Sequence, residues 1–135
     1  MLRRDPKVDL LRSVPLFSAC SNRELRRIGA IADELTFPEG KILTRQGGPG
    51  REMFILIEGT VTVERDGEEV NRLGPGDFVG EGALILHKPR NATITSLSPI
   101  RALILTDTNF TQLLHDDPDI SRKVLDTLAA RTPAV

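Results

Sequence analysis

The stretch EMFILIEGTVTVERDGEEV, from Glu52 to Val70, decides the fold of this chain. It contains an unbroken apolar run, MFILI, followed by the alternating run TVTVE, in which Val61 and Val63 fall on one face. An unbroken apolar run is typical of a central strand covered on both faces, and alternation is typical of a strand with one face on the core. Asp66-Gly67 is the strongest hairpin signal in the sequence. We therefore predict a central strand at MFILI, and an antiparallel hairpin in which Asp66-Gly67 joins TVTVE to EEV.

Similar strand-like runs extend in both directions from this stretch, over residues 36–106. Short β-prone runs alternate with glycine and proline in this region: TFPEG, KILTRQG, EMFILIEG, TVTVER, EEVNRLG, DFVG, NATITSLS and RALILTD. So many turn residues between short strands indicate an antiparallel sandwich or barrel.

Helical spacing replaces this pattern at both ends. Near the N-terminus, Ser21 and Glu24 form a capping box, and apolar residues then recur at helical spacing as far as Leu35. Near the C-terminus, Asp117 is placed to cap a helix that has Pro118 at its first position. Helices are therefore expected on both sides of the strand-rich region.

The predicted organisation is one domain over residues 1–135. We place its N-terminal helices at about 5–35, a β-roll at about 36–106 and its C-terminal helices at about 107–131. A chain of this length can bury its own core. An apolar fraction of 39% and a charged fraction of 27% are those of an ordinary globular protein.

Composition argues against several classes of function. A formal charge of −1 provides no general attraction to nucleic acid or to an anionic membrane. The charged start, MLRRDPKVDLLRS, is unlike a signal peptide, and no run reaches the ~18–20 apolar residues that span a bilayer. We therefore expect a cytoplasmic protein.

Metal chemistry is also disfavoured. Cys20 is the only cysteine, so neither an internal disulfide nor a cysteine-based metal cage can form within this sequence. His87 and His115 lack further ligands at metal-binding spacing. We expect no metal and no cofactor, which weighs against a metal-dependent enzyme on a similar sandwich.

The segment GEGALILHKPRNAT, from Gly80 to Thr93, carries the candidate site. Gly80 and Gly82 allow the backbone to approach a ligand closely, and ALIL suits one helical turn with free amides at its N-terminal end. Arg90 would arrive from the far side of the loop, so the segment can form an anion cradle. Glu81 fits there if the ligand also donates a hydroxyl, as a ribose phosphate does.

At these residues the chain resembles the cyclic nucleotide-binding domain family. The segment Gly80–Ala92 looks like that family's phosphate-binding cassette: a Gly-Glu pair, an Ala-Leu pair two residues after the Glu, and then Pro-Arg-x-Ala. Further motifs follow in the family's order: VPLFS at 14–18, FPEG at 37–40, QG at 46–47, MFILIEG at 53–59 and LGPGDFVGE at 73–81. The resemblance runs from about Leu11 to Arg131.

The resemblance implies a fold and a set of ligand contacts. The fold is mainly β with flanking helices, an eight-stranded antiparallel jelly roll (double-stranded β-helix) with N- and C-terminal helices. Glu81 would bind the ribose 2′-hydroxyl and Arg90 the cyclic phosphate, with backbone amides around Gly82, Ala83 and Ala92 completing the cradle. The ligand-binding residues implied in this way are Gly80, Glu81, Gly82, Ala83, Arg90, Asn91 and Ala92.

Two positions depart from the family's pattern. Asn91 stands where members usually carry a small residue, and a hydroxyl at that position is associated with a preference for guanine. Leu86-His87-Lys88 replaces the more usual small turn residues and places a basic group near the phosphate. The choice between cAMP and cGMP stays open, with cAMP favoured.

The resemblance implies a non-enzymatic receptor that signals by movement of its C-terminal helix. Leu125, Leu128 or Ala129 could supply an apolar lid over the base, and Arg131 could stack on it. Only four residues follow Arg131, so we expect that the protein either acts on a protein partner in trans or is a reduced, stand-alone relative of larger regulators. Neither nucleic acid nor a membrane is expected as a partner.

One alternative keeps the same fold. The chain could be a protein-interaction scaffold that no longer binds nucleotide, with Glu81 and Arg90 closing the loop as an internal salt bridge. The sequence leaves the oligomeric state open.

Overall fold

The computed structural model describes residues 5–131, which fall into two compact units. One unit runs from Ala32 to Thr108 and holds the strands. The other combines the chain up to Ile31 with the chain from Asn109 onward. The organisation as a single domain therefore stays a prediction.

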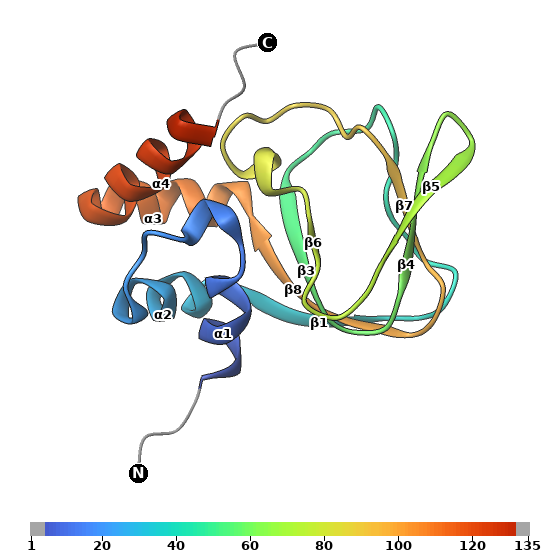
Figure 1. The fold of residues 1–135 in the computed structure, drawn as a ribbon, viewed down its shortest axis with the longest axis horizontal. Coiled ribbons are helices and arrows are strands. Elements are labelled where there is room, and N and C mark those ends of the chain that lie inside the picture. The colour runs from blue at the N-terminus through green and yellow to red at the C-terminus, as the bar shows by residue number, and fades with distance from the viewer. Residues whose placement is uncertain (1–4, 132–135) are drawn as a thin grey trace. The chain divides into compact units, whose positions relative to one another are not determined.

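The strands form two four-stranded antiparallel sheets, which can be followed in Figure 1. In order across the first sheet they are β1 (Asp33–Phe37), β8 (Ile100–Thr106), β3 (Glu52–Glu58) and β6 (Phe78–Val79). In the second sheet they are β2 (Ile42–Thr44), β7 (Thr93–Ser96), β4 (Val61–Arg65) and β5 (Glu68–Leu73). Neighbours distant in sequence, such as β1 with β8, give the eight-stranded jelly roll that the sequence predicts.

Both features predicted from the opening stretch are confirmed. Strand β3 lies between β8 and β6, and its residues Met53, Phe54, Ile55 and Leu56 are all buried. Asp66 and Gly67 join β4 to β5 with φ angles of 53° and 82°. Positive φ at both central residues is what the two-residue hairpin turn requires.

The start of the β region differs from the prediction. Helix α2 ends at Ala30, and strand β1 begins at Asp33, so the helical segment does not reach about residue 35. Residues from Asp33 to Phe37 pair in register with β8, from Ile104 to Ile100. Leu35, which the helical spacing placed on an apolar face, is 46% exposed in β1. The ladder with β8 is a long-range interaction that local spacing does not report.

The inner faces of the two sheets meet in one hydrophobic cluster. Its buried members come from both sheets: Leu56, Val61, Val63, Ala92, Ile94, Ile100 and Ala102. Leu73 and Val79 pack against this cluster while staying only partly buried. The strand core therefore extends to residues that reach a cavity.

The helical unit has its own core. Its elements are α1 (Pro6–Arg12), the 3₁₀ turn η1 (Pro15–Phe17), α2 (Asn22–Ala30), α3 (Asp107–Asp116) and α4 (Pro118–Arg131). Phe17 and Phe110 are fully buried, with ring centroids 5.6 Å apart. None of the helices within residues 5–131 combines the length and apolar character that crossing a bilayer requires.

Both predicted helix caps are present. Ser21 Oγ accepts a hydrogen bond from the Glu24 amide at 3.2 Å, and Glu24 Oε1 accepts one from the Ser21 amide at 2.8 Å. Asp117 Oδ1 accepts a hydrogen bond from the Ile120 amide at 3.1 Å at the start of α4. The capping box and the aspartate cap are therefore confirmed.

Glu24 also joins two segments that are distant in sequence. Lys123 Nζ of α4 donates to Glu24 Oε1 at 2.6 Å, and Glu24 is only 7% exposed. The hydrogen bond from Lys123, and then the one from the Ser21 amide, hold the pKa of Glu24 below its usual value. Glu24 therefore binds its proton more weakly in the folded state than in the unfolded state.

This coupling predicts how the free energy of unfolding depends on pH. The contribution of Glu24 is present above the ordinary glutamate pKa of about 4.3 and is lost as the pH falls through the lower folded pKa. As the pH falls from about 5 to about 3, the wild type should therefore lose more stability than Glu24→Gln, as measured by urea unfolding. Identical pH profiles for the two proteins would contradict the assignment.

Candidate functional site

A cavity of about 440 Å³ opens in the strand unit. Small-molecule sites span roughly 300–1,000 Å³, so its size suits a compact ligand. The seven residues that the resemblance implied all line it: Gly80, Glu81, Gly82, Ala83, Arg90, Asn91 and Ala92. The structure therefore brings the whole predicted set together.

One side of the cavity is a single 3₁₀ turn, η2 (Glu81–Leu84). Gly80 precedes the turn in the left-handed conformation, with φ at 85°, and its carbonyl accepts from the Ala83 amide at 3.0 Å. Ala83 and Leu84 are buried and anchor the turn. The turn predicted at ALIL thus begins earlier, at Glu81. The first amides of such a turn have no partner within it and point out of its N-terminal end.

Arg90 is the buried cation of the site, only 9% exposed. Its Nη2 donates to the Glu52 carbonyl oxygen at 2.7 Å and lies 3.8 Å from Glu52 Oε1. Its guanidinium carbon also sits 5.9 Å from the centroid of the Phe54 ring, within cation–π range. The structure therefore holds this side chain from β3, through Glu52 and Phe54.

Burial and a nearby carboxylate shift the pKa of this guanidinium in opposite directions. Removal from water lowers the pKa of Arg90, and the negative charge of Glu52 opposes that shift. An arginine nevertheless stays charged at physiological pH. The cavity therefore has a permanent positive charge in its wall.

Two glycines make room for this arrangement. A Cβ added at Gly80 would overlap Nη1 of Arg90 and lie 2.6 Å from the Glu52 carbonyl oxygen. A Cβ added at Gly50 would lie 2.5 Å from the Lys88 carbonyl oxygen and 3.2 Å from the Ala83 Cβ. Gly80 is thus required both by its positive φ and by the close passage of Arg90.

The backbone on either side of Arg90 is held by the loop that precedes β3. The Gly47 amide donates to the Arg90 carbonyl at 2.8 Å, and the Arg90 amide donates to the Gly48 carbonyl at 2.9 Å. Thr44 Oγ1 donates to the Ala92 carbonyl at 3.0 Å. Three consecutive contacts therefore fix the position from which the Arg90 side chain enters the cavity.

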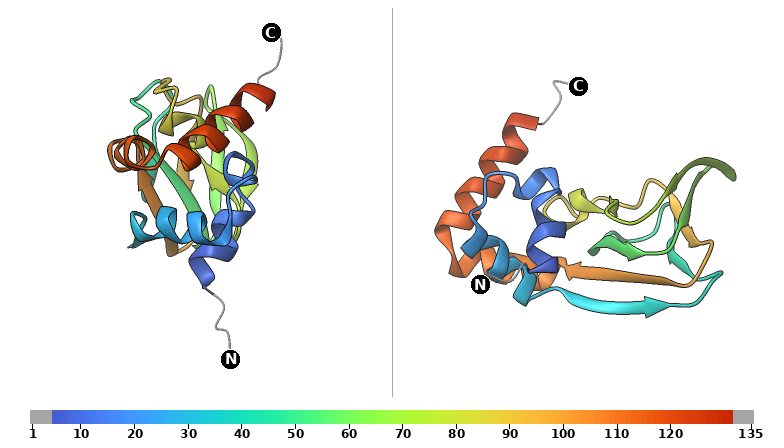
Figure 2. Two further views of the ribbon diagram at one scale, coloured as in Figure 1. Left: turned by 90° about the vertical axis from the view of Figure 1, so that its left-hand side faces the viewer. Right: turned by 60° about the horizontal axis from the view of Figure 1, so that its bottom comes forward.

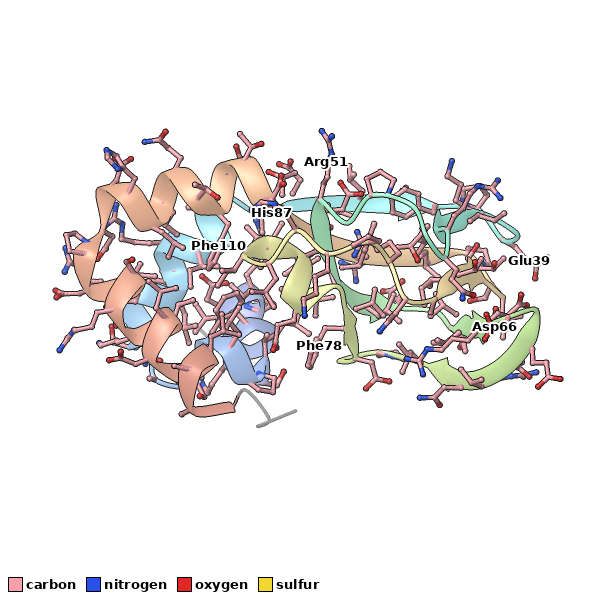
Figure 3. The ribbon with its side chains drawn as sticks, turned by 90° about the horizontal axis from the view of Figure 1, so that it is seen from above. Glu39, Arg51, Asp66, Phe78, His87 and Phe110 are labelled. Atoms are coloured by element: carbon pink, nitrogen blue, oxygen red, sulfur yellow. The ribbon has the colours of Figure 1, made fainter. Side chains whose placement is uncertain are left out.

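The same loop is tied to the β4–β5 hairpin, which forms the other side of the cavity. Gln46 Nε2 donates to Asp66 Oδ1 at 2.9 Å, and the Asp66 amide donates to Gln46 Oε1 at 2.8 Å. Figure 3 shows Asp66 at the outer end of this hairpin. The tie links the hairpin to the segment that holds Arg90.

Several lining residues were missed from the sequence. The apolar ones include Val63, Leu73, Val79 and Ile94, and the polar ones include Arg65 and Asn71. Alternation along β4 and β5 puts Val63, Arg65 and Leu73 on one face of the sheet, a signal that was available. A wall with apolar surface opposite a buried cation suits a ligand that carries both an anionic group and a flat apolar group.

Glu52 and Gly50 were also missed, for a different reason. Both lie just before the apolar run of β3, where nothing in the local pattern points to Arg90 or Lys88. Their roles arise from pairing across the sheet and from loop closure, which only the folded backbone shows.

The sequence also led to expectations about a metal site and about a lid from the C-terminal helix. Within residues 5–131, no group of three or more histidine, cysteine, aspartate or glutamate side chains could hold a metal ion. On α4, Leu125 is 45% exposed. The Arg131 side chain, proposed to stack on a base, lies outside the described part of the chain.

The comparisons with known proteins agree with this geometry. A sequence profile described as "Cyclic nucleotide-binding domain" matches residues 34–117. The chain is 36% identical, over 112 residues, to a cyclic nucleotide-gated potassium channel of Mesorhizobium japonicum. This alignment covers 83% of the chain but 31% of the channel, so the chain spans about a third of that relative.

Solved structures are similar as well. The N-terminal domain of a transcriptional regulator from Streptomyces coelicolor A3(2) superposes with a TM-score of 0.83 at 31% identity, covering 91% of each chain. The regulatory domain of Toxoplasma gondii PKA, crystallised with cAMP, superposes with a TM-score of 0.72 at 29% identity. That match covers 82% of this chain and 46% of the other. The domains of this family are regulatory and non-catalytic. With the cassette, the buried arginine and the jelly roll in place, the chain belongs to the cyclic nucleotide-binding domain family.

Proposed function

We propose that this chain is a non-enzymatic receptor for a cyclic nucleotide, with cAMP favoured over cGMP. Arg90 binds the cyclic phosphate, Glu81 accepts a hydrogen bond from the ribose 2′-hydroxyl, and backbone amides around Gly82, Ala83 and Ala92 complete the cradle. Gly80 and Asn91 border the same ligand. The observation that carries the proposal is the buried, permanently charged Arg90 in the wall of a cavity of ligand size.

The energetics favour an anion at this position. A guanidinium shielded from water gains from hydrogen bonds to a charged acceptor, each worth roughly 1.5–3 kcal/mol. Glu52 Oε1, at 3.8 Å, is too distant for a direct hydrogen bond to Nη2. A phosphate oxygen in the cavity can therefore accept hydrogen bonds from N–H groups of the Arg90 guanidinium that the Glu52 carboxylate does not use.

Two observations support a preference for cAMP over cGMP. Asn91 lacks the hydroxyl that the family associates with guanine, and the similar PKA domain of Toxoplasma gondii was crystallised with cAMP. Comparing the dissociation constants of cAMP and cGMP by calorimetry tests the preference. Recovery of the nucleotide unchanged after prolonged incubation with the protein tests the absence of catalysis.

We extend the proposal to signalling. Ligand binding shifts the population of the C-terminal helix, α4, toward one arrangement, and a protein partner in the cytoplasm reads that shift. Leu125 supports this role because a large apolar side chain 45% exposed on α4 is available to a lid or to a partner. Hydrogen exchange of the α4 amides with and without nucleotide provides the test.

The first prediction concerns the anion. Arg90→Ala leaves the phosphate with backbone amides alone, so the affinity for cAMP should fall at least about tenfold, the equivalent of one charge-assisted hydrogen bond. The measurement is calorimetric titration, with circular dichroism confirming that the fold is retained. Arg72→Ala is the matched control, because Arg72 is an exposed arginine of β5 that pairs with Glu69.

The outcome also separates the receptor from a scaffold of the same fold. If wild-type protein shows neither heat nor a thermal shift with cAMP or cGMP at millimolar concentration, the receptor role is wrong. A scaffold that has lost nucleotide binding would then account for the fold.

The second prediction concerns the sugar. Glu81→Gln should weaken cAMP binding by about 1–2 kcal/mol, because a neutral amide oxygen accepts the 2′-hydroxyl less strongly than a carboxylate does. Replacing cAMP by 2′-deoxy-cAMP should reduce the affinity of the wild type but have a smaller effect on Glu81→Gln. Equal affinity of the wild type for the two nucleotides would show that Glu81 does not contact the hydroxyl.

A further inference from the structure

His87 has an unusual backbone conformation. With φ at 52°, it is one of two non-glycine residues with positive φ among residues 5–131, the other being Asp66. The hairpin turn explains Asp66, because Asp-Gly is the preferred pair there. His87 lies in the loop between η2 and β7, directly after a helical turn that ends at Leu86, whose amide donates to the Gly82 carbonyl at 2.8 Å. Helical turns commonly end in a left-handed residue, usually glycine; the left-handed conformation costs a residue with an ordinary side chain about 1–2 kcal/mol, so a contact that holds His87 offsets this cost.

A carboxylate faces this histidine. His87 Nδ1 lies 3.1 Å from Asp107 Oδ2, and the Asp107 side chain is 17% exposed. The backbone of Asp107 is itself fixed, because its amide donates to the Arg51 carbonyl at 2.7 Å. The contact therefore ties an exposed loop to a well-held residue, the first of α3.

The His87–Asp107 contact connects the loop, through Asp107, to the same part of the chain that holds Arg90, the candidate phosphate-binding arginine. Glu52 is the first residue of β3 and Arg51 directly precedes it, and the carbonyls of Arg51 and Glu52 accept hydrogen bonds from the Asp107 amide and from Arg90 Nη2 respectively. His87 and Arg90 are joined by only two residues, Lys88 and Pro89. The short loop is thus anchored to the same point of β3 at both of its ends. The His87 contact therefore adds to the backbone bonds from Gly47 and Gly48 that position Arg90.

The surroundings of His87 are defined by a smaller cavity of about 310 Å³ beside the loop. Asp107 and Arg51 line it together with His87, and Figure 3 shows His87 and Arg51 on the same side of the molecule. The charged groups that face or adjoin the imidazole are therefore Asp107, Arg51 and its chain neighbour Lys88. Carboxylates, guanidinium groups and amines keep their charges between about pH 5.5 and pH 8, whereas an imidazole changes its charge there.

We propose that His87 is a positioning residue whose protonation tightens the hold of the loop on Arg90 and so strengthens nucleotide binding. The proposal rests on the receptor function proposed above. A protonated imidazole adds an ionic attraction to the Asp107 contact, which favours the loop conformation that presents Arg90. The cyclic phosphate keeps its single negative charge throughout this pH range. Affinity should therefore rise as the pH falls, and decline as the pH rises.

The test is the dissociation constant of cAMP between about pH 8 and about pH 5.5. For the wild type, affinity should rise roughly two- to fivefold toward the acid end, the range of an exposed ion pair. His87→Gly accepts the positive φ without strain but lacks the imidazole, and Asp107→Asn keeps the shape of its partner but not the charge. Both variants should bind with a flat pH profile. His115→Gln, a change at the other histidine, should keep the wild-type profile.

A second readout does not depend on the nucleotide. In the free protein, the backbone amide NMR signals of His87 and Lys88 should move when Asp107 is replaced by Asn, whereas that of His115 should not. Unchanged signals at His87 and Lys88, or a wild-type pH profile in His87→Gly, would overturn the positioning role. A complete lack of cAMP binding at every pH would overturn the receptor function and this role with it, while leaving the NMR result to report on the contact itself.

Discussion

The site depends on the burial of one guanidinium. A buried charge is unfavourable unless charged or polar groups compensate it. Arg90 is compensated by a carbonyl oxygen that accepts its hydrogen bond, by a nearby carboxylate and by the face of a phenyl ring. All three come from the first residues of β3. The arginine is consequently held in one place and directed at the cavity before any ligand arrives, and preorganisation of this kind lowers the cost of binding.

The architecture that holds Arg90 is the same one that forms the core. Strand β3 lies in the middle of the first sheet, so the position of Glu52 and Phe54 is set by pairing with β8 and β6. The opposite wall comes from the β4–β5 hairpin in the second sheet, and the pair Gln46–Asp66 links that hairpin to the loop preceding β3. The strand that holds Arg90 and the hairpin on the other side of the cavity are therefore both positioned by pairing within the sheets.

Among the residues that the structure describes, two non-glycine residues, Asp66 and His87, have a left-handed backbone, and the two differ in what accompanies it. Figure 2 gives two further views of the fold. Asp66 takes its conformation from a favoured turn and stabilises the hairpin. His87 stands where the family usually has small turn residues, and a long-range carboxylate accompanies it. Strain that persists because a distant group compensates it is typical of functional segments. In the helical unit, Glu24 likewise combines a local cap with a distant partner, Lys123.

The sequence by itself determined the parts that depend on local chemistry. Alternating apolar residues, frequent glycines and the Asp-Gly pair predicted the strands and the hairpin. The Ser-x-x-Glu pattern predicted the cap of α2. The cassette motif predicted residues that line one cavity. Only the tertiary structure decided the partners of Arg90, the start of β1 at Asp33, and the contact of His87 with Asp107. Each of those joins residues far apart in the chain. Local patterns report which backbone conformations a segment favours, whereas the neighbours of a side chain are set by how the strands pair and close.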